Sequence, residues 1–226
     1  MKKNNKYNIN RLQLLQMRFF RKSHKYNLSL STELEEIIIG SLLGDLHAEK
    51  KSEQSNTRLQ FKQSKKNEEY IYHLYTLFKD YCGSIPTNMK SFDSRPKKNK
   101  IYYSIKFNTY SLPCFNKFRK LFYNTKGIKI LPEEIESILT PRSLAYWIMD
   151  DGYNNISGFY LCTESFTLSE NLKLKKILKN KFNLDCGVHK NTNGYRLYIF
   201  SKSKDDLLLL IKPFLIKHFY YKFDIT

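Results

Sequence analysis

The chain has 226 residues, of which 39 are Lys or Arg and 21 are Asp or Glu, so its formal net charge is +18. This length predicts one large domain or two small ones in contact, with a core that needs no disulfide or metal. A hydrophobic fraction of 41%, with 17 Tyr and 16 Phe, argues against disorder, and no apolar run approaches the roughly 20 residues of a membrane span. The charge indicates a polyanionic partner.

The N-terminus and the cysteines indicate the compartment. Residues 1–27 contain eight Lys or Arg, no acidic residue and no apolar stretch, which predicts a basic N-terminal extension and not a secretory signal. The four cysteines never form a C-x-x-C pair, which argues against a zinc site or a disulfide scaffold. This usage suits a reducing, intracellular compartment.

The first predicted helix ends in an aspartate. Its start fits a capping box with Thr32 as the N-cap and Glu35 reaching back, and an apolar run then continues to Asp45. Small residues spaced by four would form one helix face that admits a second helix closely, or would only relieve a crowded core. They are Gly40, Gly44 and Ala48.

A strand, a helix, a hairpin and a closing helix are predicted next. Their ranges are 57–63, 67–81, 85–92 with 100–107, and 111–123. Alternation in the first strand places Arg58, Gln60 and Lys62 on one face and apolar residues on the other. That polar face is either a solvated sheet surface or one that offers cations and an amide to a nucleic-acid groove.

The same order of elements follows a linker. Residues 126–140 carry Gly127 and Pro132 and a short helical stretch, which is linker chemistry. Thr140 before a proline then predicts the start of a helix that ends at Asp151. A strand (159–166), a helix (168–183), a hairpin (186–190 with 195–201, turning at 191–194) and a last helix (204–219) complete the unit.

Landmarks in the two units share nearly the same offset. Asp151 lies 106 residues after Asp45, and the pair Cys186-Gly187 lies 104 residues after Cys82-Gly83. The spacing predicts a duplicated unit of about 105 residues. We expect a first half at 28–125, a linker at 126–140 and a second half at 141–226.

The two terminal aspartates point to a metal. A carboxylate is disfavoured at a helix C-terminus, where the helix dipole is negative, and two equivalent carboxylates near a pseudo-twofold axis would repel each other. Mg²⁺ prefers such hard oxygen ligands. Beside a polyanion, this chemistry favours metal-dependent phosphodiester hydrolysis, although a solvated C-terminal Asp is common at either position alone.

These segments resemble the paired motifs of the LAGLIDADG homing endonucleases. The stretch from Leu144 to Gly152 is the more specific match, whereas in the first motif Leu46 replaces the usual final Gly and Ser41 replaces an apolar residue. The resemblance runs in order from about residue 30 to 223 and is nearest to the monomeric two-motif type, such as the ω-intron endonuclease. It implies an α+β fold of two αββαββα halves whose saddle-like antiparallel sheets straddle DNA.

The resemblance also implies a set of site residues. Asp45 and Asp151 would bind the metal with their side chains, and Gly44 and Asp150 with their backbone carbonyls, while the Asp150 side chain would point elsewhere. Lys129 and Lys222 would polarise water or steady the scissile phosphate, and Gln60 would order water. Expected DNA contacts are Arg58, Gln60, Lys62, Lys97, Lys98, Lys100, Glu164, His189, Lys190 and Arg196.

The expected activity is site-specific, Mg²⁺-dependent cleavage of double-stranded DNA by a monomer, at a long asymmetric target and with staggered 3′ overhangs. Mn²⁺ is expected to substitute, and Ca²⁺ to bind without supporting cleavage. The alternatives are an intron RNA maturase and a non-cleaving DNA-binding regulator on the same fold. The Lys, Asn, Ile, Tyr and Phe content suggests an AT-rich genome, as in a mitochondrion or chloroplast. No membrane or obligate protein partner is expected.

Overall fold

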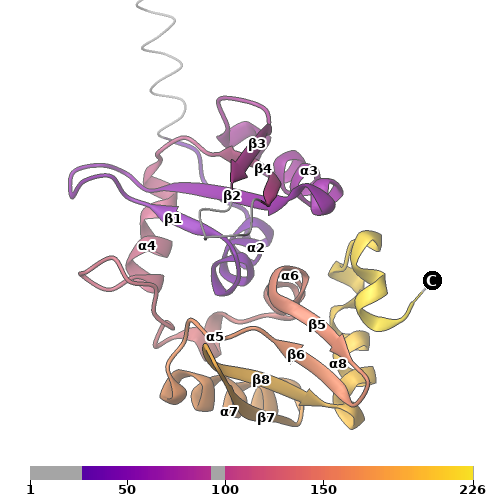
Figure 1. Cartoon of the computed structure of the whole chain (residues 1–226). Coiled ribbons are helices and arrows are strands. Elements are labelled where there is room, and N and C mark those ends of the chain that lie inside the picture. The colour runs from indigo at the N-terminus through magenta and orange to yellow at the C-terminus, as the bar shows by residue number, and fades with distance from the viewer. Residues whose placement is uncertain (1–26, 93–99, 226) are drawn as a thin grey trace, which may run out of the picture.

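The computed structural model describes residues 27–92 and 100–225, and its elements follow one order twice (Figure 1). The first half contains α2 (Thr32–Leu43), β1 (His47–Glu49), β2 (Arg58–Ser64), α3 (Glu68–Phe78), β3 (Thr87–Phe92), β4 (Ile101–Asn108) and α4 (Asn116–Phe122). After the short α5 (Ile135–Ile138), the second half contains α6 (Pro141–Asp151), β5 (Gly152–Asn155), β6 (Gly158–Leu161), α7 (Leu168–Phe182), β7 (Cys186–Asn191), β8 (Gly194–Phe200) and α8 (Lys204–Ile211). The α+β class and the duplicated αββαββα order are confirmed.

Each half builds one four-stranded antiparallel sheet. The strand orders are β1-β2-β4-β3 and β5-β6-β8-β7, so the two sheets have the same topology. Figure 1 shows α2 and α6 side by side between the sheets, with α7 behind the second sheet. Helix α3 packs on β2 and β4, and α7 packs on β7 and β8, so that among the described residues no helix covers the opposite face of either sheet.

The two aspartate-ended helices pack backbone against backbone. A Cβ atom on Gly40 would lie 2.1 Å from the carbonyl oxygen of Ser143, and one on Gly44 would lie 2.6 Å from the Cβ of Asp150. Close packing through small residues is therefore confirmed for the two glycines. The prediction that Ala48 belongs to this helix face was wrong, because α2 ends at Leu43 and Ala48 lies in β1.

Helix caps agree with the sequence in one half and shift by one residue in the other. Ser31, not Thr32, is the N-cap of α2, and its hydroxyl accepts a bond from Leu34 N–H, so the predicted capping box was wrong. Thr140 caps α6 as predicted and accepts a bond from Ser143 N–H at 3.2 Å. A capping box does start α7, where Thr167 and Glu170 satisfy each other's backbone N–H.

Several predicted boundaries were wrong. The first strand of each sheet, β1 and β5, was absent from the pattern-based prediction because three or four residues give no clear alternation. Strand β6 ends at Leu161, since the chain then turns and Thr163 bonds to the side chain of Asn171. Helix α8 ends at Ile211 and is followed by short 3₁₀ turns up to Phe223.

The hairpin predicted at 191–194 is confirmed, because β7 ends at Asn191 and β8 begins at Gly194. The basic extension up to residue 26 and the basic loop with Lys97 and Lys98 lie outside the described residues. Within the described part of the chain, no helix has the length and apolar character needed to cross a bilayer.

Candidate active site at the junction of the two halves

The two motif aspartates meet at the same end of the packed helices. Asp45 follows the Gly44 cap of α2, and Asp151 is the last residue of α6. Because the helices run side by side and their glycine contacts bring backbones together, the two carboxylates come from different halves to one place. The charge of Asp45 contributes to raising the pKa of Asp151, which places the two groups within electrostatic reach.

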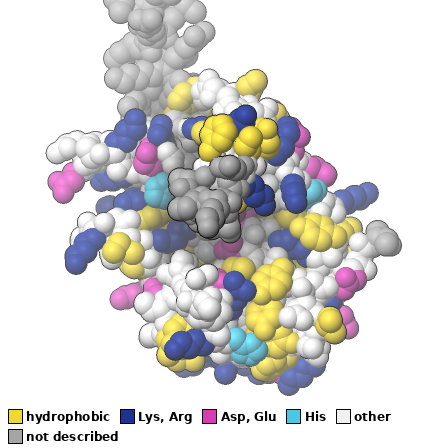
Figure 2. Space-filling model, viewed as in Figure 1, with side chains coloured by type: hydrophobic (Ala, Val, Ile, Leu, Met, Phe, Trp, Pro, Cys, Tyr) yellow, Lys and Arg dark blue, Asp and Glu magenta, His cyan; other side chains and the backbone are white. Residues whose placement is uncertain are grey.

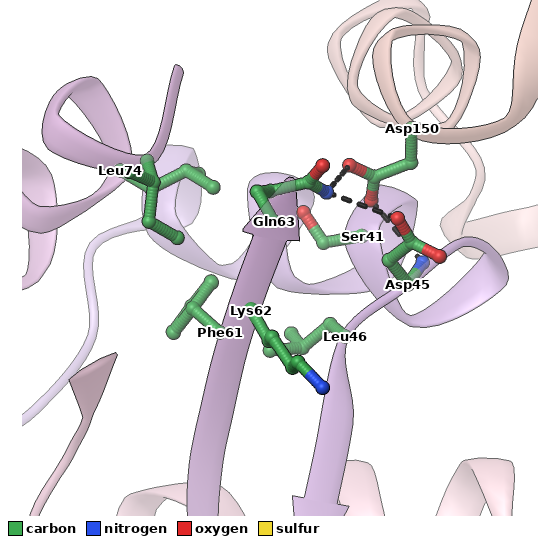
Figure 3. Close-up of a pocket in the computed structure, with 9 residues that line it drawn as sticks. Ser41, Asp45, Leu46, Phe61, Lys62, Gln63, Leu74 and Asp150 are labelled. Carbon is green, nitrogen blue, oxygen red and sulfur yellow. Dashed lines mark hydrogen bonds between the residues drawn. The ribbon is translucent and has the colours of Figure 1, made fainter. Parts of the chain in front are cut away.

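A third carboxylate and an amide, neither predicted as a functional side chain, join the pair. Gln63 donates to Asp45 at 3.0 Å and to Asp150 at 3.1 Å, and the backbone N–H of Asp45 donates to Asp150 at 3.4 Å (Figure 3). The Asp150 side chain therefore faces the junction and does not point elsewhere, which corrects the expectation. Gln63 follows Lys62 in β2 and lies on the inward face of the strand, with Leu59 and Phe61. A polar residue on this otherwise apolar face was the feature of the sequence that could have indicated its role.

Each of the two predicted lysines donates hydrogen bonds to backbone carbonyls near the C-terminus of one motif helix. Lys129 Nζ donates to the carbonyls of Gly44 at 2.8 Å and Leu46 at 3.2 Å. Lys222 Nζ donates to the carbonyls of Ile148 at 2.9 Å and Met149 at 2.7 Å. Both ammonium groups thus bind carbonyls at the negative end of a helix dipole, beside an aspartate. An ammonium has three donors, so each keeps one for a further group.

Burial shifts the pKa values of the groups in this cluster in the direction that favours their neutral forms. Desolvation raises the pKa of Asp45 and raises that of Asp151 to about 7, with the repulsion from Asp45 adding to the second shift. Burial also lowers the pKa of Lys129 and lowers that of Lys222 to about 8, against the attraction of the nearby carboxylates. Burial is the main cause of all four shifts, and for Asp151 the charge of Asp45 adds to it.

This donor set fits a divalent cation of the Mg²⁺ type. Mg²⁺ is commonly held by one or two carboxylates together with waters and substrate phosphates. Asp45 and Asp151 supply such carboxylates from the two halves, and a cation would offset the burial and the repulsion from Asp45 that raise the pKa of Asp151. Within the described residues no group of three or more His, Cys, Asp or Glu side chains forms a closed metal centre. The expected contribution of the Gly44 and Asp150 carbonyls stays a prediction.

The described residues expected to contact DNA lie on or beside the strands of the two sheets. Arg58, Gln60 and Lys62 lie on the face of β2 opposite the core, as predicted, with Arg58 paired to Glu49. Gln60 makes no bond to Asp45, and its catalytic role stays a prediction. Lys100 is exposed beside the ring of Tyr102.

In the second half, Glu164 lies in the loop after β6 and not in the strand predicted for it. It pairs with Arg196 of β8 and accepts a bond from Asn191 at 3.0 Å. His189 and Lys190 are exposed on β7. Apart from Lys97 and Lys98, which lie outside the described residues, the expected contacts therefore form one group in each half.

Two αββαββα halves with paired aspartates at their junction define the two-motif architecture that the sequence predicted. Residues 35–207 match the sequence profile of the LAGLIDADG DNA endonuclease family. The chain belongs to this family.

Relatives within the family include both maturases and endonucleases. The chain is 37% identical over 202 residues to the cytochrome b mRNA maturase bI2 of Debaryomyces hansenii, a match that spans 87% of this chain and 76% of the relative. It is 33% identical over 212 residues to the DNA endonuclease I-ChuI of Chlamydomonas applanata, spanning 86% of this chain and 96% of the relative. Among solved structures, the homing endonuclease I-WcaI bound to its DNA recognition sequence matches with a TM-score of 0.83 at 28% identity, over 96% of this chain and 99% of that one.

Proposed function

We propose that the protein is a site-specific homing endonuclease that hydrolyses double-stranded DNA with Mg²⁺ as cofactor. The observation that carries the proposal is the meeting of Asp45 and Asp151, one from each half, between two helix-free sheet faces. A net charge of +18 supports a polyanionic substrate. The I-WcaI structure, similar over nearly the whole chain, was solved with that protein's DNA recognition sequence.

The chain's own residues would position the reaction. Asp45 and Asp151 would hold the cation, which when bound supplies a Lewis acid for the scissile phosphate and lowers the pKa of bound water. Lys129 and Lys222, anchored on backbone carbonyls, would each direct their remaining donor to a phosphate oxygen or a water. Gln63 would keep Asp45 in place through its 3.0 Å bond.

The substrate would be a long and asymmetric sequence. Two sheets of the same topology can each cover one half-site, so a monomer suffices, as in the two-motif type that the ω-intron endonuclease represents. Because the residues on the two sheets differ, the two half-sites would differ too. Cleavage of both strands beside one pair of carboxylates would leave staggered 3′ overhangs.

The second candidate is an intron RNA maturase, favoured by the 37% identity to a cytochrome b mRNA maturase. Both activities suit a basic surface. The presence of both aspartates and both lysines at the junction supports the nuclease, because RNA binding alone does not require them. An organellar gene, mitochondrial or plastid, is our proposal for the source, supported by the AT-type composition.

Cleavage of a randomised duplex library tests the proposal. The library is incubated with Mg²⁺ or with Ca²⁺, and the new ends are sequenced. Staggered ends clustered on one long sequence, obtained with Mg²⁺ and not with Ca²⁺, are the expected result. Tight, salt-dependent binding with no enriched cut, and a higher affinity for an intron transcript than for duplex DNA, would contradict it.

A further inference from the structure

The two helix-free sheet faces differ at equivalent positions next to the active site. In the first sheet, His47, Gln60 and Asn108 lie side by side across β1, β2 and β4 and form the polar row. In the second sheet, Tyr153, Tyr160 and Tyr198 lie side by side across β5, β6 and β8 and form the aromatic row. Both rows begin two residues after a motif aspartate, so they occupy matching places in the two halves.

The aromatic row is a packed set of rings, in which Tyr153 and Tyr160 are partly exposed and Tyr198 is buried beneath its neighbours. The rings of Tyr153 and Tyr160 stack with centroids 5.2 Å apart, and those of Tyr160 and Tyr198 lie 4.6 Å apart. His189 stacks on Tyr198 at 4.8 Å, and Phe200 meets the edge of Tyr198 at 5.7 Å. Figure 2 shows hydrophobic side chains gathered on the lower half of this face, around a histidine.

The polar atoms of the aromatic row are already bonded within the protein. The Tyr153 hydroxyl accepts a bond from Arg196 at 2.9 Å, the Tyr160 hydroxyl bonds to His189 at 3.2 Å, and the Tyr198 hydroxyl donates to the carbonyl of Ser157. Arg196 is also paired with Glu164. This surface therefore has apolar ring edges to offer and few free donors.

The polar row has the opposite character. His47 is bonded through Nδ1 to the Tyr123 hydroxyl at 3.1 Å, but among the residues that the structure describes the side chains of Gln60 and Asn108 have no hydrogen-bond partner. Lys62 and Lys106, which pair across the neighbouring row, likewise make no ion pair with any described residue. This face offers amides and cations to base edges and phosphates.

We propose that the two halves recognise their half-sites by different chemistry: the aromatic row contacts thymine C5-methyl groups in the major groove, and the polar row makes hydrogen bonds. The inference rests on the proposed function. Thymine is the base that presents a methyl group in the major groove, and apolar side chains contact it. Stacking on unpaired RNA bases suits this surface less, because the ring faces of Tyr153 and Tyr160 are occupied by each other.

Replacing thymine by uracil in the duplex tests the inference, since it removes the methyl and leaves pairing intact. Once the library gives the target, duplexes with deoxyuridine in one half-site or the other are compared for affinity and cleavage. We expect about fourfold weaker binding for each contacted methyl in one half, and a ratio near one in the other half. A target with no thymine at the end of either half nearest the cleavage site, or equal ratios in both halves, would overturn the inference.

Variants of Tyr160 assign the effect to the aromatic row. Tyr160→Ser removes the ring, and the half-site whose uracil effect then shrinks is the one that the second sheet contacts. Tyr160→Phe keeps the ring and loses the hydroxyl, so its thymine-to-uracil ratio should match that of the unmodified protein. If Tyr160→Phe abolishes the ratio, recognition uses the hydroxyl and the inference is wrong. The matched variant Gln60→Ser should leave this ratio unchanged.

Failure of the inference is distinguishable from failure of the proposed function. A protein that cleaves a specific duplex equally well with thymine and uracil keeps the proposed function and loses the inference. A protein that binds no specific duplex loses both. Tighter binding of a single-stranded uridine-rich RNA than of the duplex, reduced in Tyr160→Ser, would assign the aromatic row to RNA and overturn the inference.

Discussion

The two halves of the chain carry matching groups where they meet and different groups on the sheets that lead away. At the junction, each half contributes an aspartate at the end of a helix, and a lysine bonds to two backbone carbonyls near the end of each helix. On the sheets, the polar row of the first half occupies the position that the aromatic row occupies in the second half. Cleavage of the two antiparallel strands of DNA requires similar catalytic groups in both halves. Recognition of an asymmetric target requires a different surface in each half.

Apart from changes to the two motif aspartates, replacing the lysines is expected to give the largest loss of cleavage. Lys129→Met and Lys222→Met should each lower the cleavage rate by about a hundredfold or more, the scale for removing one preorganised charged donor, while DNA binding persists. Cleavage rates at saturating Mg²⁺, beside affinities, measure this. Unchanged rates would limit both lysines to a helix-capping role.

The same pair should differ in stability. Lys222 is buried with 6% of its surface exposed, whereas Lys129 is half-buried. Lys222→Met should therefore destabilise the protein more, by about 1–3 kcal/mol, because the carbonyls of Ile148 and Met149 lose the lysine donor and only Ile148 keeps another bond, from the N–H of Gly152. Thermal unfolding of the two variants gives the difference. Equal melting temperatures would show that the halves are alike here too.

Adding one methyl group at Gly40 is expected to disrupt the packing of the two motif helices. Gly40→Ala should destabilise the protein by about 1–3 kcal/mol or more, because the new Cβ would overlap the backbone of Ser143. Gly187→Ala is the matched control in the second sheet, since its Cβ would meet nothing closer than 3.4 Å. Chemical denaturation of both proteins compares them. A Gly40→Ala protein as stable as the control would mean that the motif helices do not approach as closely as described.

Salt dependence should separate the two sheet faces. If about eight phosphates are neutralised, log affinity falls against log salt with a slope near −7, at roughly 0.9 per phosphate. Lys62→Ala should reduce the slope by about one, because this lysine has no ion pair among the described residues. Arg196→Ala should reduce it less, because Glu164 already neutralises that charge. Equal changes would remove this difference between the halves.

A smaller effect concerns the capping box that α7 has and α3 lacks. Partial burial alone would raise the pKa of Glu170, yet bonds from the N–H groups of Leu131 and Thr167 lower it below the ordinary value. A lowered pKa in the folded state stabilises the protein above the unfolded pKa, and this stabilisation disappears as the pH falls through the folded value.

Glu170→Gln should therefore cost about 1 kcal/mol at pH 7, and the difference should shrink at an acidic pH well below the ordinary pKa of a glutamate. Urea denaturation at both pH values measures it. Ser169→Ala, an exposed change in the same helical turn, is the control and should stay within about 0.5 kcal/mol. A cost for Glu170→Gln that is equal at both pH values would mean that the carboxylate charge contributes nothing.

The sequence predicted the parts of this fold that repeat or that bury long apolar runs. The offset of Asp45 and Asp151 predicted the duplication, and the alternation in β2 predicted the outward face of Gln60 correctly. It could not predict β1 and β5, whose few residues are held by pairing with β2 and β6 and not by their own pattern.

The sequence predicted which motif residues belong to the site better than it predicted the contacts between the two halves. Both motif aspartates and both lysines come to the junction, although their roles stay predictions. The bonds from Gln63 to Asp45 and Asp150 join two halves that are far apart in sequence, so no local pattern could indicate them. The difference between the polar row and the aromatic row also depends on strand register, which only the structure supplies.

Cleavage by Asp45→Asn and Asp151→Asn proteins tests the central claim most directly, because each change removes one carboxylate charge and keeps its shape. On the target found with the library, and with Mg²⁺ present, we expect both variants to bind the duplex with nearly unchanged affinity and to leave it uncut. Undiminished cleavage by the Asp151→Asn protein would contradict the assignment of the paired aspartates as the metal-binding centre.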